Sequence, residues 1–202
     1  MSRDVKTDNQ FLPHKLSLRR YFLDKYHSRG ELRVFDACQG AGTIWNHLKS
    51  EIKIASYWGV DRKKKPGRVQ IDSVRILIQP GWNFNVVDVD VYGSPWKHWA
   101  ALLPNISEPT TVFLTIGHTR KGGGGADYFS LCALGCDFPT LQVPGSIAIK
   151  IIIERALPYD LALARQHGLS IVEAAEIFPQ LRTVRYIGVH LRPACSEGTR
   201  TT

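Results

Sequence analysis

Residues 32–48, LRVFDACQGAGTIWNHL, join a short apolar segment, a glycine-containing turn and a segment with helical apolar spacing. The first six of them, LRVFDA, have the composition of a short buried strand. Gly40 and Gly42 allow a tight turn and let the backbone approach a ligand closely. The stretch GTIWNHLKSEI, which begins at Gly42, is typical of a helix. The sequence therefore predicts a strand, a turn and a helix in succession.

The glycine turn matches neither common phosphate-binding pattern. A dinucleotide-binding turn has a third glycine, and Trp45 stands in its place here. The Gly-Lys-Ser/Thr of a P-loop does not follow either. Asp36 adds negative charge where a diphosphate would lie, whereas an acid suits a ligand with a positively charged amino group. The alternative interpretation is a plain strand–helix connection without a ligand.

Outward from this unit, strand-like and helix-like segments alternate. A helix is expected from Leu16 and ends at Gly30. Further strands are predicted at 55–61, 67–72, 85–90 and 110–117, the last two separated by a helix that begins near Pro95. The C-terminal segments 169–178 and 183–191 predict an antiparallel pair of strands. This order favours an α/β, Rossmann-like fold: a mostly parallel seven-stranded sheet with a C-terminal antiparallel strand and helices on both faces.

The remaining segments set the domain organisation. Residues 120–135 predict a glycine-rich loop and a helix, and residues 146–168 a helix interrupted at Pro158. We expect a flexible N-terminal arm over 1–10, a single domain over 11–192 and a flexible tail over 193–202.

Composition favours an anionic partner. The 202 residues carry 26 Lys and Arg against 18 Asp and Glu, a net charge of +8, so nucleic acid is the first candidate. The four cysteines form no Cys-x-x-Cys pair and do not cluster with histidines, so no metal is expected. The polar start MSRDVKTDNQ and the lack of a long apolar run predict a cytoplasmic protein without a membrane span.

Acidic residues end the second and third predicted strands. Asp61 is placed to take both hydroxyls of a ribose, or else it balances the basic run 62–65. Asp72 is placed to accept from an adenine amino group, or else it caps the helix that follows.

The order of these features resembles the class I S-adenosylmethionine-dependent methyltransferases. The resemblance implies S-adenosyl-L-methionine as cofactor, with its methionine part beside Asp36, Gly40 and Gly42. It places Asp61 on the ribose and Asp72 near the adenine, and Asp88 is assigned to the cofactor-binding set as well.

The fourth predicted strand ends in DVDVYGSPW, residues 88–96. The amino group of a nucleic-acid base is a poor nucleophile, because its lone pair is delocalised into the ring. A carboxylate and a backbone carbonyl that accept its two N–H groups favour a nucleophilic nitrogen, and an aromatic ring stacks on the base. The alternative interpretation is a strand end that caps the next helix.

This segment is closely similar to that of the tRNA guanine-N2 dimethyltransferases. The similarity implies that Asp90 is the catalytic acid, that Val91 supplies the carbonyl and that Tyr92 lies against the base. Substrate contacts are then expected from a set around these residues and beyond the fifth strand: Ser94, Pro95, Trp96, Arg120 and Lys121.

The chain also departs from that family. Val91 replaces a proline, Gly145-Ser146 replace a His-Glu pair, and the family's additional C-terminal domain is missing. One expectation that follows is a separate subunit that recognises the substrate. The sequence thus predicts N-methylation of an exocyclic amino group on RNA, tRNA-like in preference to DNA. A small-molecule or protein methyltransferase and a catalytically inactive nucleic-acid-binding protein are the alternatives.

Overall fold

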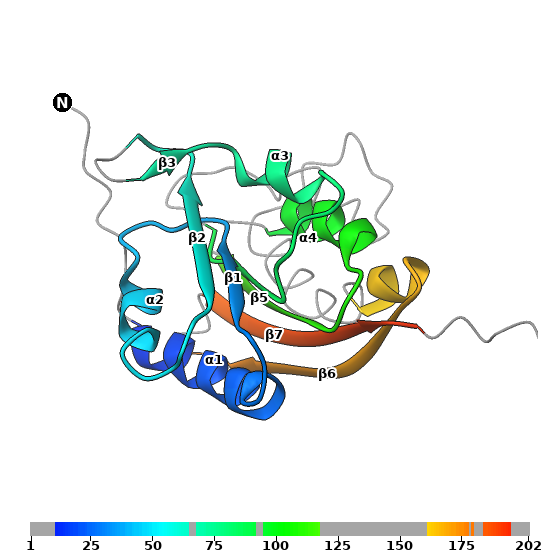
Figure 1. Cartoon of the computed structure of the whole chain (residues 1–202), viewed down its shortest axis with the longest axis horizontal. Coiled ribbons are helices and arrows are strands. Elements are labelled where there is room, and N and C mark those ends of the chain that lie inside the picture. The colour runs from blue at the N-terminus through cyan, green and yellow to red at the C-terminus, as the bar shows by residue number, and fades with distance from the viewer. Residues whose placement is uncertain are drawn as a thin grey trace, which may run out of the picture.

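A seven-stranded sheet runs through the molecule, as Figure 1 shows. In chain order its strands are β1 (Arg33–Asp36), β2 (Ser56–Asp61), β3 (Val69–Gln70), β4 (Val86–Val89), β5 (Thr110–Gly117), β6 (Leu169–Ile177) and β7 (Val184–Pro193). The computed structural model describes residues 11–64, 68–91, 95–117, 161–177, 179 and 184–194. Across the sheet the order is β3-β2-β1-β4-β5-β7-β6.

The pairing of the strands confirms the predicted fold class. β1 pairs in parallel with β2 and β4, and β2–β3 and β4–β5 are parallel as well. β7 runs antiparallel to both β5 and β6. The parallel strands therefore end at one edge, which is where ligands bind in sheets of this kind.

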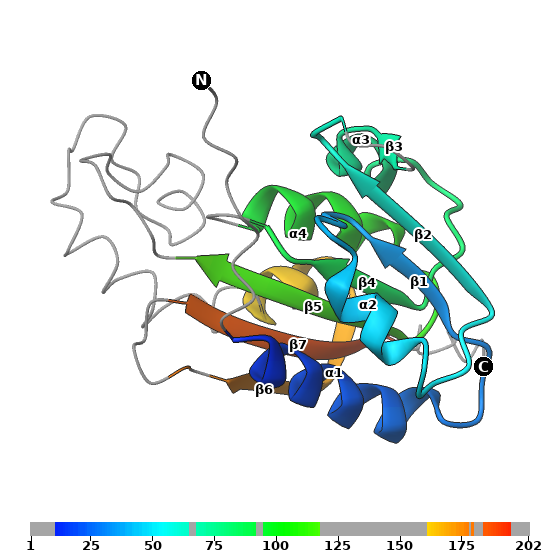
Figure 2. The ribbon, with the colours of Figure 1, turned by 90° about the vertical axis from the view of Figure 1, so that its left-hand side faces the viewer.

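Helices cover both faces of the sheet. They are α1 (Leu12–His27), α2 (Thr43–Leu48), α3 (Ser73–Leu77), α4 (Trp96–Leu102), the 3-10 turn η1 (Leu103–Asn105) and a helical stretch at 161–166. α1 and α2 lie on one face and α4 on the other, as the two views of Figures 1 and 2 show. Each face has its own buried apolar cluster, so the sheet separates two cores.

Two helices differ in length from the prediction. α1 begins at Leu12 rather than Leu16, because Pro13 is favourable in a first helical turn. It ends at His27, and the N–H of Gly30 bonds to the His27 carbonyl. α2 ends at Leu48, well short of the predicted 42–52.

α1 packs closely on β7. Phe22 of α1 has no exposed surface, and a Cβ atom built on Gly188 would lie 2.5 Å from its ring. The Phe22 ring also meets Phe113 edge-on, with centroids 5.9 Å apart. The missing side chain at Gly188 thus lets α1 approach the sheet, and this brings its polar residues within reach of β4.

Several predictions fall outside the described residues. These are the loop and helix at 120–135, most of the helix at 146–168, the arm at 1–10 and the tail after 194. The proposed domain boundaries therefore remain predictions.

Candidate active site

Four carboxylates gather at the edge where the parallel strands end. Asp36 ends β1 and Asp61 ends β2, while Asp88 lies in β4 and Asp90 follows it. Asp36 and Asp88 are partners in the β1–β4 register. The sequence predicted that these acids share one site, and the topology brings their strand ends together.

The glycine turn connects β1 to α2 next to Asp61. Gly40 and Gly42 have φ values of +52° and +69°, a left-handed conformation that glycine adopts without strain. The N–H of Gly40 donates to Asp61 Oδ2 at 3.0 Å, and the N–H of Lys63 donates to Oδ1 at 2.9 Å. Asp61 therefore holds the turn in place, and each of its oxygens keeps a second lone pair directed elsewhere.

Asp36 is 4% exposed. The Tyr57 hydroxyl donates to its Oδ2 at 2.8 Å, and the Cys38 N–H approaches Oδ1 at 3.4 Å. Burial, reinforced by the negative charge of Asp88, raises the pKa of Asp36 to about 8. A cationic group placed beside it would stabilise the ionised carboxylate, so this position favours a positively charged ligand group.

Asp88 is bound on both oxygens. Arg19 of α1 donates from Nε to Oδ2 at 2.7 Å and from Nη2 to Oδ1 at 2.5 Å, and Trp45 Nε1 donates to Oδ2 at 2.8 Å. The Arg19 and Asp88 side chains are each 1% exposed. This arrangement joins α1, α2 and β4 in the interior, and it gives Asp88 a set of protein partners that the sequence did not predict.

Asp90 carries a different kind of ion pair. Lys15 Nζ lies 2.6 Å from Asp90 Oδ2, and the two side chains are 9% and 20% exposed. Lys15 stands one helical turn before Arg19 in α1. Asp90 is thus the more accessible of the two acids at the end of β4.

The other predicted site residues lie partly at helix starts, partly in the apolar core and partly outside the described residues. Asp72 caps α3 by accepting from the Val74 N–H at 3.1 Å, which is the alternative that the sequence left open. Val91 packs against the apolar core, and Pro95 precedes α4. Trp96 is 3% exposed and belongs to that core. The predicted positions Tyr92, Ser94, Arg120 and Lys121 lie outside the described residues.

Solved structures resemble this chain, although neither a protein-family model nor a curated protein sequence matches it. Trm1 from Pyrococcus horikoshii, in complex with S-adenosyl-L-methionine, has a TM-score of 0.62 at 12% identity, over 91% of this chain and 55% of that one. The fold is that of the S-adenosylmethionine-dependent methyltransferases.

Two further structures extend the comparison. The plantazolicin methyltransferase BamL, in complex with a triazolic desmethylPZN analogue and S-adenosylhomocysteine, has a TM-score of 0.56 at 11% identity, over 91% of this chain and 86% of that one. The 1,6-didemethyltoxoflavin-N1-methyltransferase of Burkholderia thailandensis has a TM-score of 0.55 at 14% identity, and the match covers 95% of this chain and 82% of that one. This chain spans about half the length of Trm1. The predicted methyltransferase fold is confirmed, while the substrate class is left open.

The residues around the glycine turn fit the cofactor of such a fold. Asp61 offers two carboxylate oxygens beside the turn, and Asp36 offers a buried acid. The Oε1 atom of Gln39, inside the turn, is buried and has no hydrogen-bond partner among the described residues. A buried acceptor of this kind calls for a donor, and an ammonium or hydroxyl group of a ligand would supply one.

Lys15 and Arg19 are the site residues that sequence reasoning missed. The available signal was their spacing, since Lys15, Arg19, Phe22 and Tyr26 fall on one stripe of α1 at intervals of four, three and four residues. Two cations that continue an apolar stripe indicate acidic partners in the interior or at its edge, here the buried Asp88 and the partly exposed Asp90.

Within the part of the chain that the structure describes, the side chains form neither a metal centre nor a membrane span. There, no three His, Cys, Asp or Glu side chains come together as metal ligands would. Nor does any helix in those ranges combine the length and apolar character needed to cross a membrane.

Proposed function

We propose that this chain is an S-adenosylmethionine-dependent N-methyltransferase that acts on an exocyclic amino group of a nucleic-acid base. The observation that carries the proposal is the position of Asp90. It follows β4 at the edge where the glycine turn and Asp61 lie, and it keeps a 20% exposed carboxylate among buried neighbours. A carboxylate there is suited to accept the N–H of an incoming amino group.

The cofactor contacts follow from the polar groups at the strand ends. Asp61 would hold the ribose hydroxyls and Asp36 and Gln39 the ammonium end, while Asp72, whose Oδ1 caps α3, would lie on the adenine side. When bound, the cofactor supplies an electrophilic methyl group. The chain then has to present a nitrogen in line with it and to exclude competing water.

Asp90 and Val91 orient that nitrogen. Asp90 accepts one N–H and the Val91 carbonyl accepts the other, so that the lone pair is directed at the methyl group. The nitrogen loses a proton as it gains the methyl group, and Asp90, at the edge of the site, passes this proton toward solvent. Stacking of Tyr92 on the base is proposed from the sequence alone, because this residue lies outside the described ranges.

The ion pair with Lys15 favours an acceptor without charge. Asp90 and Lys15 together are neutral, and so are Asp88 and Arg19. A protein lysine would enter as an ammonium and would have to lose its proton before it could accept a methyl group, and the acids of β4 already have cationic partners, whereas the amino group of a base enters neutral. This supports the nucleic-acid proposal over the protein-methyltransferase alternative, and it leaves neutral small molecules as the second candidate.

RNA is the favoured nucleic acid because residues 88–96 are closely similar to the corresponding segment of the tRNA guanine-N2 dimethyltransferases, while the basic residues near the site fit any phosphate backbone. The net charge of +8 and the exposed Arg62, Lys63 and Lys64 directly after Asp61 provide phosphate contacts near the site. Replacing Lys63 and Lys64 by alanine should flatten the dependence of log affinity on log salt concentration. An unchanged slope would show that this segment is an ordinary solvated loop without phosphate contacts.

The test combines labelled methyl transfer with binding. Wild-type protein is incubated with radiolabelled S-adenosylmethionine and bulk tRNA, rRNA or DNA, and the methylated nucleoside is identified. Asp90→Ala should lose most of kcat and Asp90→Asn less, because the amide keeps an oxygen acceptor. Both variants should bind S-adenosylhomocysteine as the wild type does in calorimetry.

Asp61→Ala is the complementary variant. It should weaken S-adenosylhomocysteine binding by about 1.5–3 kcal/mol through loss of charge-assisted hydrogen bonds. Wild-type protein that binds no S-adenosylhomocysteine would sink the proposal, and Asp90→Ala at the wild-type rate would sink its mechanism.

A further inference from the structure

The two cations of α1 match the two acids of β4 in spacing. Lys15 and Arg19 are four residues apart on the helix, which is about 6.0 Å of rise. Asp90 and Asp88 are two residues apart at the strand end, which is about 6.6 Å. Lys15 meets Asp90 at 2.6 Å and Arg19 meets Asp88, so α1 lies antiparallel to β4 with both pairs in register.

The two pairs are built differently. Arg19 grips Asp88 with two nitrogen atoms, a third donor comes from Trp45, and both partners of the ion pair are 1% exposed. Lys15 contacts Asp90 through a single atom, and among the described contacts it engages Oδ2 only. In the Arg19–Asp88 pair, protein donors occupy both carboxylate oxygens. In the Lys15–Asp90 pair the described contacts engage only Oδ2, so Oδ1 is available to a substrate.

Lys15 is itself held in position. Its ammonium lies 5.4 Å from the centroid of the Tyr186 ring, within the range of a cation–π contact. The side chain is 9% exposed, so a defined set of neighbours surrounds it. Arg19, one turn further along, fixes the height of α1 against β4.

We propose that Lys15 is the positioning residue for Asp90. By holding Oδ2, it fixes the plane of the carboxylate and directs Oδ1 toward the acceptor amino group. This role rests on the proposed function, and it adds a residue from the first helix to a site otherwise built from strand ends. A competing role for the same ammonium is direct contact with a substrate phosphate.

The experiment measures kcat and KM for methylation of bulk tRNA. Lys15→Met should lower kcat about 10–100-fold, the effect of misplacing a reacting group by up to about 1 Å, with KM within about twofold of wild type. Lys15→Arg should recover part of the loss, because a guanidinium can still hold the carboxylate. Lys25→Met is the matched control: it also removes a lysine of α1 with an ion pair, to Glu173 at 2.9 Å, and should leave kcat unchanged.

A double variant separates positioning from other roles. Lys15→Met combined with Asp90→Asn should be no slower than Asp90→Asn alone, because Lys15 acts through the carboxylate. Thermal unfolding of each variant shows whether it is folded, and Lys15→Arg provides the comparison if Lys15→Met is not.

Three outcomes would overturn the role of Lys15. They are a wild-type kcat for Lys15→Met, additive losses in the double variant, or a raised KM with unchanged kcat, which would indicate a phosphate contact. A wild-type protein that binds S-adenosylhomocysteine but methylates no nucleic acid would instead refute the proposed function, and the role of Lys15 with it.

Discussion

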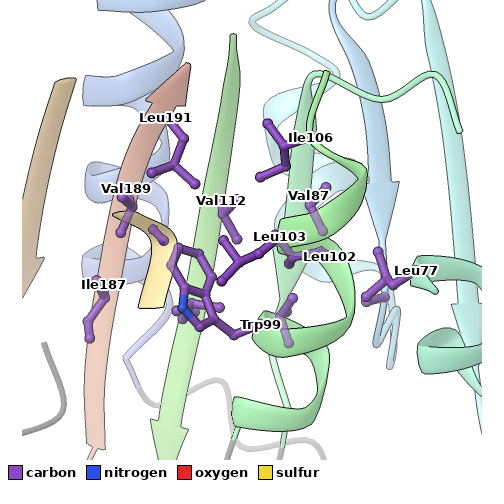
Figure 3. Close-up of a cluster of buried hydrophobic side chains, with 14 of the residues drawn as sticks. Leu77, Val87, Trp99, Leu102, Leu103, Ile106, Val112, Ile187, Val189 and Leu191 are labelled. Atoms are coloured by element: carbon purple, nitrogen blue, oxygen red, sulfur yellow. The ribbon is translucent and has the colours of Figure 1, made fainter. Parts of the chain in front are cut away.

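The two faces of the sheet are built from different chemistry, although the same strands supply both. In β4, Val87 and Val89 point into the cluster beneath α4, while Val86 and the buried acid Asp88 point toward α1. β5 repeats the division: Val112 and Leu114 face α4, and the Thr111 hydroxyl meets histidines on the α1 side. Figure 3 shows aliphatic side chains and the Trp99 ring gathered between α4 and the sheet.

The apolar α4 face mainly stabilises the fold, whereas the polar α1 face positions the acidic side chains. Apolar burial on the α4 face is non-directional and stabilises the fold in proportion to area. The ion pairs on the α1 face each cost desolvation, and what they add is a fixed geometry for the acids. The candidate active site therefore lies where the polar interior reaches the end of the strands.

Breaking the polar side should have the largest effect. Asp88→Ala leaves the guanidinium of Arg19 and the Trp45 indole N–H buried without their acceptor, so we expect a loss of about 3–5 kcal/mol in the free energy of unfolding, measured with urea. The double variant Asp88→Ala with Arg19→Met should lose less than the sum of the two single variants. Simple additivity would mean that the two side chains do not act as a pair.

The apolar side should respond by loss of packing alone. Leu102 of α4 has no exposed surface, and Leu102→Ala should cost about 2–4 kcal/mol through the cavity it leaves. Urea unfolding measures the loss, and S-adenosylhomocysteine affinity should be unchanged under native conditions. A large loss of affinity with little loss of stability would show that the α4 face takes part in positioning after all.

The pH dependence of stability should come from the α1 face of the sheet, and its magnitude should be smaller than the effects of the two substitutions above. His27 Nε2 and His190 Nδ1 each lie 2.8 Å from the Thr111 hydroxyl, and burial lowers the pKa of both histidines to about 4. Between about pH 6.5 and 4 the unfolded chain binds more protons, so stability falls as the pH falls through this range. We expect roughly 1–2 kcal/mol between pH 7 and 5 after allowance for solvent screening.

A variant isolates this contribution. Asp36, whose pKa is raised, acts in the opposite sense, because its folded carboxyl keeps a proton that the unfolded chain has released, and stability falls as the pH rises toward 8. Subtracting the pH profile of a His27→Gln, His190→Asn variant from that of the wild type cancels the Asp36 contribution. A difference that does not change with pH would contradict the assignment to the histidines.

The sequence predicted the fold from local signals. The β1–α2 unit, the later strands and the reversed C-terminal pair each combine composition, period and turn residues that agree with one another. The ends of α1 and α2 were less well predicted, because capping and packing decide them rather than periodicity.

The candidate site was predictable only in part. Acids at strand ends can be found by their order along the chain, so Asp36, Asp61 and Asp90 were identified as a group. Which cation pairs with which acid depends on the height of α1 against β4, and residues 69 positions apart, such as Arg19 and Asp88, carry no local trace of it. Asp72 is a different case, because its cap on the Val74 N–H is a local contact that the sequence already offered as one of two alternatives.

The packing of α1 on β6 and β7 also has a consequence during synthesis of the chain. α1 leaves the ribosome well before its partners on β6 and β7: Tyr21 and Glu173, which share a hydrogen bond, are 152 residues apart. At about 5–20 residues per second, roughly 8–30 seconds of translation separate them. During that interval Phe22 can already meet Phe113 of β5, whereas Tyr21 and Tyr26 still lack their partners on β6 and β7, so we expect these two tyrosines to stay uncovered until those strands emerge.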